Sequence, residues 1–339
     1  MTKISSQHWW LFESFRKAIR QPLFGITVLT VSVFAMIAFG LLGIGRGGEA
    51  FADVRYWYVA AKAWLAGLNP YDHNVFQTLA TESGLGDLMP FAYPPQSFAI
   101  GIYLAAFPFK IAQLVWTITN VIAVILLSFF GVQLLKSRET NTEVECSRLA
   151  RWIIPAIIIG NPFTAHVLWT GQTAMVICVV LIGSWQLAYN GKPLLSGVLL
   201  GFASIKPQLS VLVILWLFLE GQWRTLLTAG ISMLAFSAVP ILVVSPSKIL
   251  SEWGNAMKAY QLDPAIASGL SYNTNLKSLL NGLGLNLPPL SLLFFMLVAI
   301  AITFVIWRMW RGGKLHRNDI LGILLGLSLL LFFVIIFRT

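Results

Sequence analysis

The chain has 339 residues, of which 57% are hydrophobic and only 11% are charged, and its formal net charge is +10 at pH 7. A water-soluble protein of this length does not need so much apolar surface, so the composition predicts an all-α, polytopic integral membrane protein. The basic residues stand in clusters beside apolar runs rather than in one continuous basic segment. This distribution argues against nucleic acid as a partner and leaves membrane lipids as the surroundings of the chain.

The first apolar run, 23–42, is long enough to span a bilayer. It is preceded by Lys3, Arg16, Lys17 and Arg20. Positive charge on this side of the run places the N-terminus in the cytoplasm. Because the run exceeds the apolar part of a cleaved signal peptide, we expect a retained signal anchor in the plasma (inner) membrane.

The segment 45–96 is predicted to be a large first outer loop. Its aromatic residues between Tyr56 and Trp64 have spacings compatible with an amphipathic helix near the membrane interface. The loop carries Asp53 at the start of that helix, where Asp is a favoured N-cap. Tyr93-Pro94-Pro95 leads the chain back to the membrane.

Further apolar runs lie at 97–109, 112–135, 152–168, 173–189, 194–205, 208–219, 225–245, 290–307 and 320–337. The run 97–109 is too short for an ordinary span, so we expect it to be re-entrant or tightly coupled to 112–135. Together the runs predict about nine or ten membrane segments in a single integral membrane domain, 1–339.

Lys206 is the only fixed charge within the long apolar segments, and Pro207 follows it directly. A lone ammonium at membrane depth costs at least about 2.5–3.5 kcal/mol, so this side chain should face a cavity or an anionic ligand. Proline breaks a helix, which predicts that 194–205 and 208–219 form two arms of a hairpin with its tip on the outer side. The alternative is a lysine that merely reaches the outer head groups from a helix end.

Basic loops predict the orientation of the later segments. The cytoplasmic positions are expected to include Lys192, Arg224, Arg308, Arg311, Lys314 and Arg317. The outer face then carries the large loops, so an active site is expected on the outer side.

Several motifs occur in a fixed order along the chain. They are Asp53 after the first span, Tyr58-x-x-Ala61-x-Ala63-x-x-x-Gly67-x-x-Pro70-Tyr71-Asp72, Tyr93-Pro94-Pro95, Gly171-Gln172, and Gly197-x-x-x-Gly201-x-x-x-x-Lys206-Pro207. This ordered set resembles the polyprenol-phosphate-mannose-dependent mannosyltransferases of glycosyltransferase family 87, in the multi-spanning GT-C superfamily. The resemblance extends over residues 23–282.

The resemblance implies that an acidic residue in the first outer loop acts as catalytic base, and Asp53 matches that position. A positioned carboxylate can take the proton of an acceptor hydroxyl as it attacks the anomeric carbon of the sugar. Displacement of a lipid phosphate in one step inverts that carbon, and Lys206 or Arg55 can stabilise the leaving phosphate. The resemblance implies two partners, a polyprenyl-phosphate hexose donor whose sugar is mannose and a lipid or glycan acceptor.

Other polar residues are candidate substrate contacts with a structural alternative for each. Gln172 and Asn161 can bind sugar hydroxyls or cap helices. Tyr93 can shape the sugar pocket or simply precede a helix that its prolines begin. Asn273 can cap a short helix or contact the acceptor. Asp72, after Pro-Tyr, is more typical of a turn or cap.

No cofactor or metal is predicted. The sequence has no Walker phosphate loop, no dinucleotide fingerprint and no Asp-x-Asp motif, so a nucleotide-sugar donor is disfavoured. His73 and His166 are far apart in the chain, which gives no metal-ligand pair.

Two other functions stay open. A transporter or flippase for a lipid-linked or anionic substrate would use Lys206-Pro207 as a broken-helix site, although such proteins commonly repeat the break in a second half of the chain. A non-catalytic membrane subunit would tolerate replacement of Asp53.

Overall fold

The computed structural model describes residues 22–45, 50–136, 144–262, 291–315 and 317–332. These residues form helices joined by turns and loops, and no strand occurs among them, which confirms the all-α prediction. Contacts divide the chain into two compact units, Met1–Ala50 with Thr117–Met175 and Phe51–Trp116 with Val176–Thr339. The single membrane domain over 1–339 stays a prediction.

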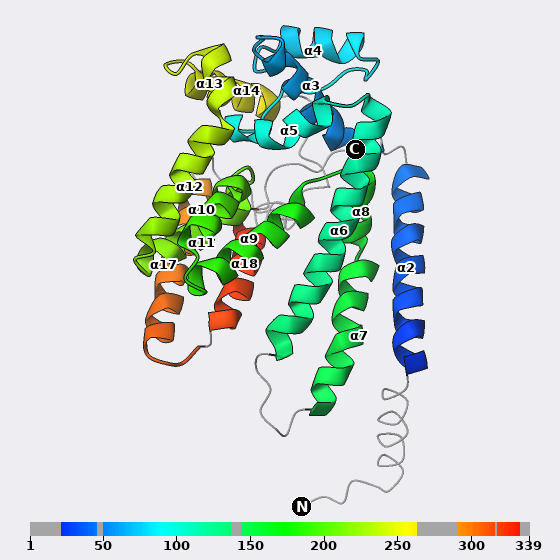
Figure 1. The fold of residues 1–339 in the computed structure, drawn as a ribbon, viewed down its shortest axis with the longest axis vertical. Coiled ribbons are helices and arrows are strands. Elements are labelled where there is room, and N and C mark those ends of the chain that lie inside the picture. Colours follow the sequence, from blue (N-terminus) through cyan, green and yellow to red (C-terminus); the bar gives the residue numbers. More distant parts are fainter. Residues whose placement is uncertain (1–21, 46–49, 137–143, 263–290, 316, 333–339) are drawn as a thin grey trace, which may run out of the picture. The chain divides into compact units, whose positions relative to one another are not determined.

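The first unit is a group of long apolar helices (Figure 1). Its elements are α2 (Pro22–Gly45), the greater part of α6 (Phe109–Lys136), α7 (Val144–Gly160) and α8 (Pro162–Thr170). The helix α2 packs along both α7 and α8. Two glycines of α2 make room for bulky rings: Gly25 faces the Trp152 ring, and a Cβ at Gly43 would lie 2.9 Å from the Trp169 ring. Small residues therefore set the close approach of these helices.

Apolar helices of this kind support the prediction of a membrane protein. Within the described residues, 2 helices, Pro22–Gly45 and Phe109–Gln133, are long and apolar enough to cross a membrane, or up to 4 if each of two bent pairs is one span. The bent pairs are Arg151–Gly160 with Pro162–Thr170, at 52°, and Trp223–Phe236 with Ala238–Val244, at 51°. The expected nine or ten segments are not confirmed and stay a prediction.

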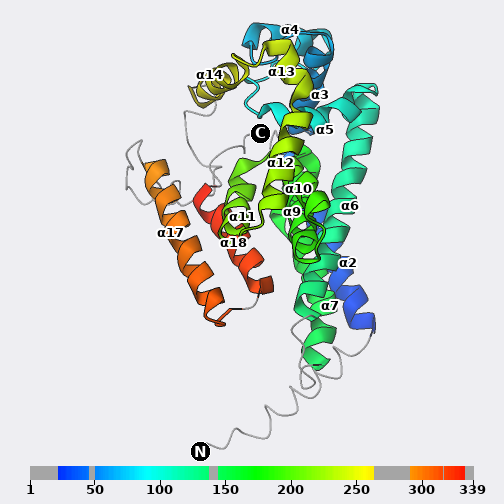
Figure 2. The same cartoon turned by 60° about the vertical axis from the view of Figure 1, so that its left-hand side comes forward.

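The second unit begins with the predicted outer loop and ends with the C-terminal helices. Its first elements are α3 (Ala52–Leu65), α4 (His73–Glu82), the 3-10 turn η1 (Pro95–Ser97) and α5 (Phe98–Ala105). Its later elements are α9 (Ala174–Tyr189), α10 (Pro193–Ala203), α11 (Pro207–Leu219), α12 (Trp223–Phe236), α13 (Ala238–Val244), α14 (Ile249–Leu262), α17 (Ser291–Arg311) and α18 (Arg317–Phe332). The α17 and α18 helices pack against each other and against α11 (Figure 2).

The helix α3 is the centre of the first part of this unit. Trp57 and Trp64 on α3 are almost fully buried, and only Leu65 at its end is exposed. The helix α5 packs closely on it, because a Cβ at Gly101 would lie 2.6 Å from both the Trp57 carbonyl oxygen and the Ala61 Cβ. The amphipathic helix predicted here therefore exists, but protein rather than lipid covers most of its faces.

The helix α10 packs along α12 through a stripe of small residues. A Cβ at Gly197 would lie 2.6 Å from the Thr225 carbonyl oxygen, and one at Gly201 would lie 2.8 Å from the Ala229 carbonyl oxygen. Only glycine allows the two backbones to approach so closely. This contact fixes the far end of α10, where the chain turns into the candidate site.

Candidate functional site

The Asp53 carboxylate stands at the beginning of α3. Asp53 lies in the first turn of the helix, and the N-cap position belongs to Phe51, which adopts a left-handed conformation with φ 60°. The capping role considered for Asp53 therefore does not apply. The side chain is only 8% exposed, and the positive end of the helix favours a negative charge at this position.

The predicted helix break at Lys206 is confirmed. The helix α10 ends at Ala203 and α11 begins at Pro207, so Lys206 lies in the short connection between them. Lys206 is 5% exposed, and its ammonium forms no hydrogen bond or ion pair with the described residues. A buried cation without such a partner is suited to an anionic ligand.

Asp53 and Lys206 interact electrostatically, although they come from segments far apart in the chain. The fold thus brings the candidate base and the candidate phosphate-binding cation into one buried region. Both residues belong to the second unit, so its own packing sets their arrangement.

Gln96 ties the η1 turn to the connection that carries Lys206. Its Nε2 atom donates to the carbonyl oxygen and to the hydroxyl of Ser204, each at 3.2 Å, and both residues are buried. The Ser204 hydroxyl donates in turn to the Gly201 carbonyl oxygen at 2.6 Å. The Tyr93-Pro94-Pro95 motif therefore also positions the Lys206 connection.

Tyr93 presents a buried hydroxyl near Asp53. Its ring lies 3.7 Å from the Trp57 ring, centroid to centroid. Burial, and after it the charge of Asp53, raise the pKa of Tyr93 well above its ordinary value, so the hydroxyl stays protonated. This hydroxyl has no hydrogen-bond partner among the described residues. It can therefore donate to a substrate oxygen.

The Tyr93 segment is held by Tyr71, in the loop after α3, and by the helix α14. The Tyr71 hydroxyl donates to the Tyr93 carbonyl oxygen at 3.0 Å. On α14, Trp253 Nε1 donates to the Ala92 carbonyl oxygen at 3.0 Å, and Tyr260 is a lesser cause of the raised pKa of Tyr93. The α14 helix thus supports the segment that carries Tyr93. The sequence did not indicate Tyr260, Gln96 or Ser204, because their roles arise from packing between distant segments.

Arg55 and Asp72 have local roles in the same unit. The Arg55 guanidinium donates to the Leu85 carbonyl oxygen at 3.2 Å. Asp72 is the N-cap of α4 and accepts from the backbone N–H of Asn74 at 2.9 Å, which confirms the prediction of a cap. A direct role of Arg55 toward a phosphate stays a prediction.

Asn161 and Gln172 belong to the first unit. Asn161 is the N-cap of α8, where its side chain accepts from the Phe163 N–H at 2.8 Å. Gln172 is 2% exposed and follows Gly171, whose φ of 74° ends the helix. Their proposed contacts with sugar hydroxyls stay predictions, and Asn273 lies outside the described residues.

The described residues contain no group of three or more His, Cys, Asp and Glu side chains that could hold a metal ion. The histidine of the apolar run, His166, packs edge-on against Trp169, with ring centroids 5.0 Å apart.

The family model described as glycosyltransferase family 87 matches residues 91–335. Tyr93, Gln96 and Lys206 lie inside the matched range, and Asp53 precedes it. No curated protein and no solved structure gives a significant match.

Proposed function

Because the chain belongs to glycosyltransferase family 87, we propose that it transfers a hexose, mannose in the first instance, from a polyprenyl phosphate to a lipid or glycan acceptor. In this proposal Asp53 is the general base, and Lys206 binds the donor phosphate. The observation that carries it is the burial of both residues within one compact unit, where the charge of Asp53 acts on the Lys206 amine.

The reaction is a single displacement. The acceptor oxygen forms a bond to the anomeric carbon while the bond from that carbon to the phosphate oxygen breaks. The electron pair of the broken bond goes to the phosphate, and the acceptor proton goes to Asp53. Attack from the face opposite the phosphate inverts the anomeric centre, and no carboxylate nucleophile is needed.

Each residue of the site has a separate contribution. The Lys206 ammonium neutralises charge that builds on the leaving phosphate. The Tyr93 hydroxyl donates to a sugar oxygen, and the buried Trp57 ring packs against the Tyr93 ring and holds it in position. Gln96 acts indirectly, because its bonds to Ser204 hold the connection that bears Lys206.

A lipid-linked donor suits the helices that surround Lys206. The α10 helix has 11 residues, which corresponds to about 16 Å, roughly half of the hydrocarbon thickness. In the proposed orientation, with the N-terminus cytoplasmic and the site on the outer side of the plasma membrane, Lys206 then lies below the outer surface. A donor phosphate with its polyprenyl chain in the bilayer can reach that depth laterally.

The test is a transfer assay with the purified protein in detergent. Polyprenyl-phosphate mannose is supplied with alkyl glycosides as acceptors, and both the released polyprenyl phosphate and the anomeric configuration of the product are measured. We expect product formation with inversion. A transporter or flippase would form no glycosidic product in this assay, and that outcome would reject the transferase assignment.

A further inference from the structure

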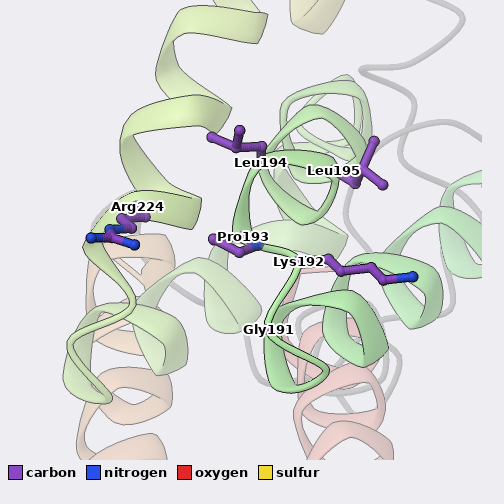
Figure 3. Close-up of a pocket in the computed structure, with 6 residues that line it drawn as sticks. All are labelled: Gly191, Lys192, Pro193, Leu194, Leu195 and Arg224. Carbon is purple, nitrogen blue, oxygen red and sulfur yellow. The ribbon is translucent and has the colours of Figure 1, made fainter.

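An open pocket lies at the start of α10, away from the candidate site. It has a volume of about 470 Å³ and is lined by Gly191, Lys192, Pro193, Leu194, Leu195 and Arg224. Figure 3 shows the cationic side chains of Lys192 and Arg224 on the two sides of Pro193. The 11 residues of α10 separate this pocket from the Lys206 connection.

The lining combines positive charge with exposed apolar surface. Lys192 and Arg224 are both exposed, and no carboxylate lines the pocket or pairs with either cation among the described residues. Leu194 is 66% exposed and Leu195 is 58% exposed. The pocket therefore offers a site for an anionic group next to a site for hydrocarbon.

The same end of the unit carries a further cation, Arg317. The Arg317 guanidinium lies 4.0 Å from the centre of the Tyr189 ring. Tyr189 precedes Gly191, the first residue of the pocket lining, by two positions in the chain. The nearby carboxylate of Glu220 accepts a hydrogen bond from the Tyr189 hydroxyl, so it is engaged there. The ends of α9, α11 and α18 thus meet beside the pocket, where the charges of Arg317 and Glu220 offset each other and the net positive charge is that of Lys192 and Arg224.

Local helix geometry adds to the attraction for an anion. The α10 helix begins at Pro193 and α12 begins at Trp223, so both helices have their positive ends at the pocket. Because the lining includes both cationic side chains and exposed leucines, a soluble anion would use only part of it. An amphiphile with a negative head group uses both parts.

We propose that this pocket binds an anionic phospholipid, with its phosphodiester at Lys192 and Arg224 and an acyl chain against Leu194 and Leu195. The site is distinct from the proposed donor site and does not depend on the transferase assignment. It would hold an annular lipid in a defined position at the start of α10.

The experiment measures binding of fluorescent phosphatidylglycerol and phosphatidylcholine to the full chain in neutral detergent micelles. We expect preferential binding of phosphatidylglycerol. The double variant Lys192→Gln/Arg224→Gln should weaken it roughly 25-fold, since each basic residue near an anionic head group contributes about fivefold. The matched control, Lys248→Gln/Lys258→Gln, removes the same charge from exposed positions elsewhere in the unit and should change the affinity less than twofold.

Three outcomes would overturn the proposal: equal binding of the two lipids, equal losses in the two double variants, or no loss in the first. Competition with glycerol phosphate supplies a separate readout. We expect it not to displace the lipid, because it lacks the acyl chain. Displacement at equal concentration would show a simple anion pocket and contradict the lipid assignment.

Discussion

Gln96 donates two hydrogen bonds to Ser204, and the two residues stand 108 positions apart in the chain. These bonds join the η1 turn, which follows Tyr93, to the connection that carries Lys206. Both partners are buried, so solvent cannot replace the bonds if they are lost. The relationship makes Gln96 a positioning residue for the proposed phosphate-binding cation.

Gln96→Met should keep much of the side-chain volume but remove both bonds. We expect kcat to fall roughly 10–100-fold, because a small displacement of a catalytic cation has a large effect on rate. The cost in unfolding free energy should be about 1–3 kcal/mol. Gln222→Met, at the start of α12, is the control. An unchanged kcat in purified Gln96→Met would exclude the positioning role.

Gly201→Ala should destabilise the protein, because the added Cβ would lie 2.7 Å from the Ser232 Cβ and 2.8 Å from the Ala229 carbonyl oxygen. Overpacking of this kind costs about 1–3 kcal/mol. The matched control is Gly230→Ala on α12, where nothing lies within 4 Å of the new Cβ. Thermal unfolding in detergent compares the two variants. Equal midpoints would mean that α10 and α12 do not pack as closely as described.

Some features of this site follow from the sequence alone. Pro207 and the charge of Lys206 predicted the break between α10 and α11, because a proline lacks the N–H that continues a helix. Asp72 after Pro70-Tyr71 predicted a helix cap, because an Asp side chain can accept hydrogen bonds from the backbone N–H groups that follow it. Such signals act within a few residues, and the structure confirms both.

Other features need the tertiary structure. The residues around Tyr260 in the sequence do not indicate that Tyr260 contributes to the raised pKa of Tyr93. The sequence does not indicate the hydrogen-bond partner of Gln96 either, because Ser204 lies 108 positions away in the chain. Asp53 shows the limit of a local rule: Asp favours N-cap positions, yet Phe51 takes the N-cap and leaves Asp53 inside the first turn.

The topology can be tested with single cysteines at exposed positions of the second unit in a cysteine-free background. We expect Glu82→Cys and Ser251→Cys to react with a membrane-impermeant maleimide from outside. Arg224→Cys and Lys314→Cys should react only after the membrane is permeabilised. All four positions are exposed, so a lack of labelling reports the side of the membrane. Labelling of Glu82→Cys and Lys314→Cys from the same side would contradict the proposed orientation.

Lys206→Met should weaken donor binding and transfer together, because it keeps much of the stem but removes the charge-assisted contacts to phosphate. Lys206→Arg should restore binding only in part, since a planar guanidinium differs in shape from an ammonium. Direct binding of polyprenyl-phosphate mannose is compared with Lys258→Met, an exposed control. A lysine that only reaches the outer head groups would give equal donor affinities in wild type and Lys206→Met.

Asp53→Asn tests the proposed base most directly. The amide is nearly isosteric with the carboxylate but cannot accept the acceptor's proton, so transfer should fall roughly 10²–10⁴-fold. Donor binding should change far less, because the phosphate contact is assigned to Lys206. The control is Asp87→Asn, an exposed aspartate of the same segment whose Oδ1 accepts from Gln77 at 2.6 Å.

The Asp53→Asn result also separates the remaining functions. Near-normal transfer with intact folding would remove Asp53 from the chemistry and direct the search for the base to other residues of the site. Loss of transfer with unchanged donor affinity would instead assign Asp53 to the chemical step. A non-catalytic subunit would show no transfer in the wild type, so the wild-type rate decides that alternative before any variant is compared.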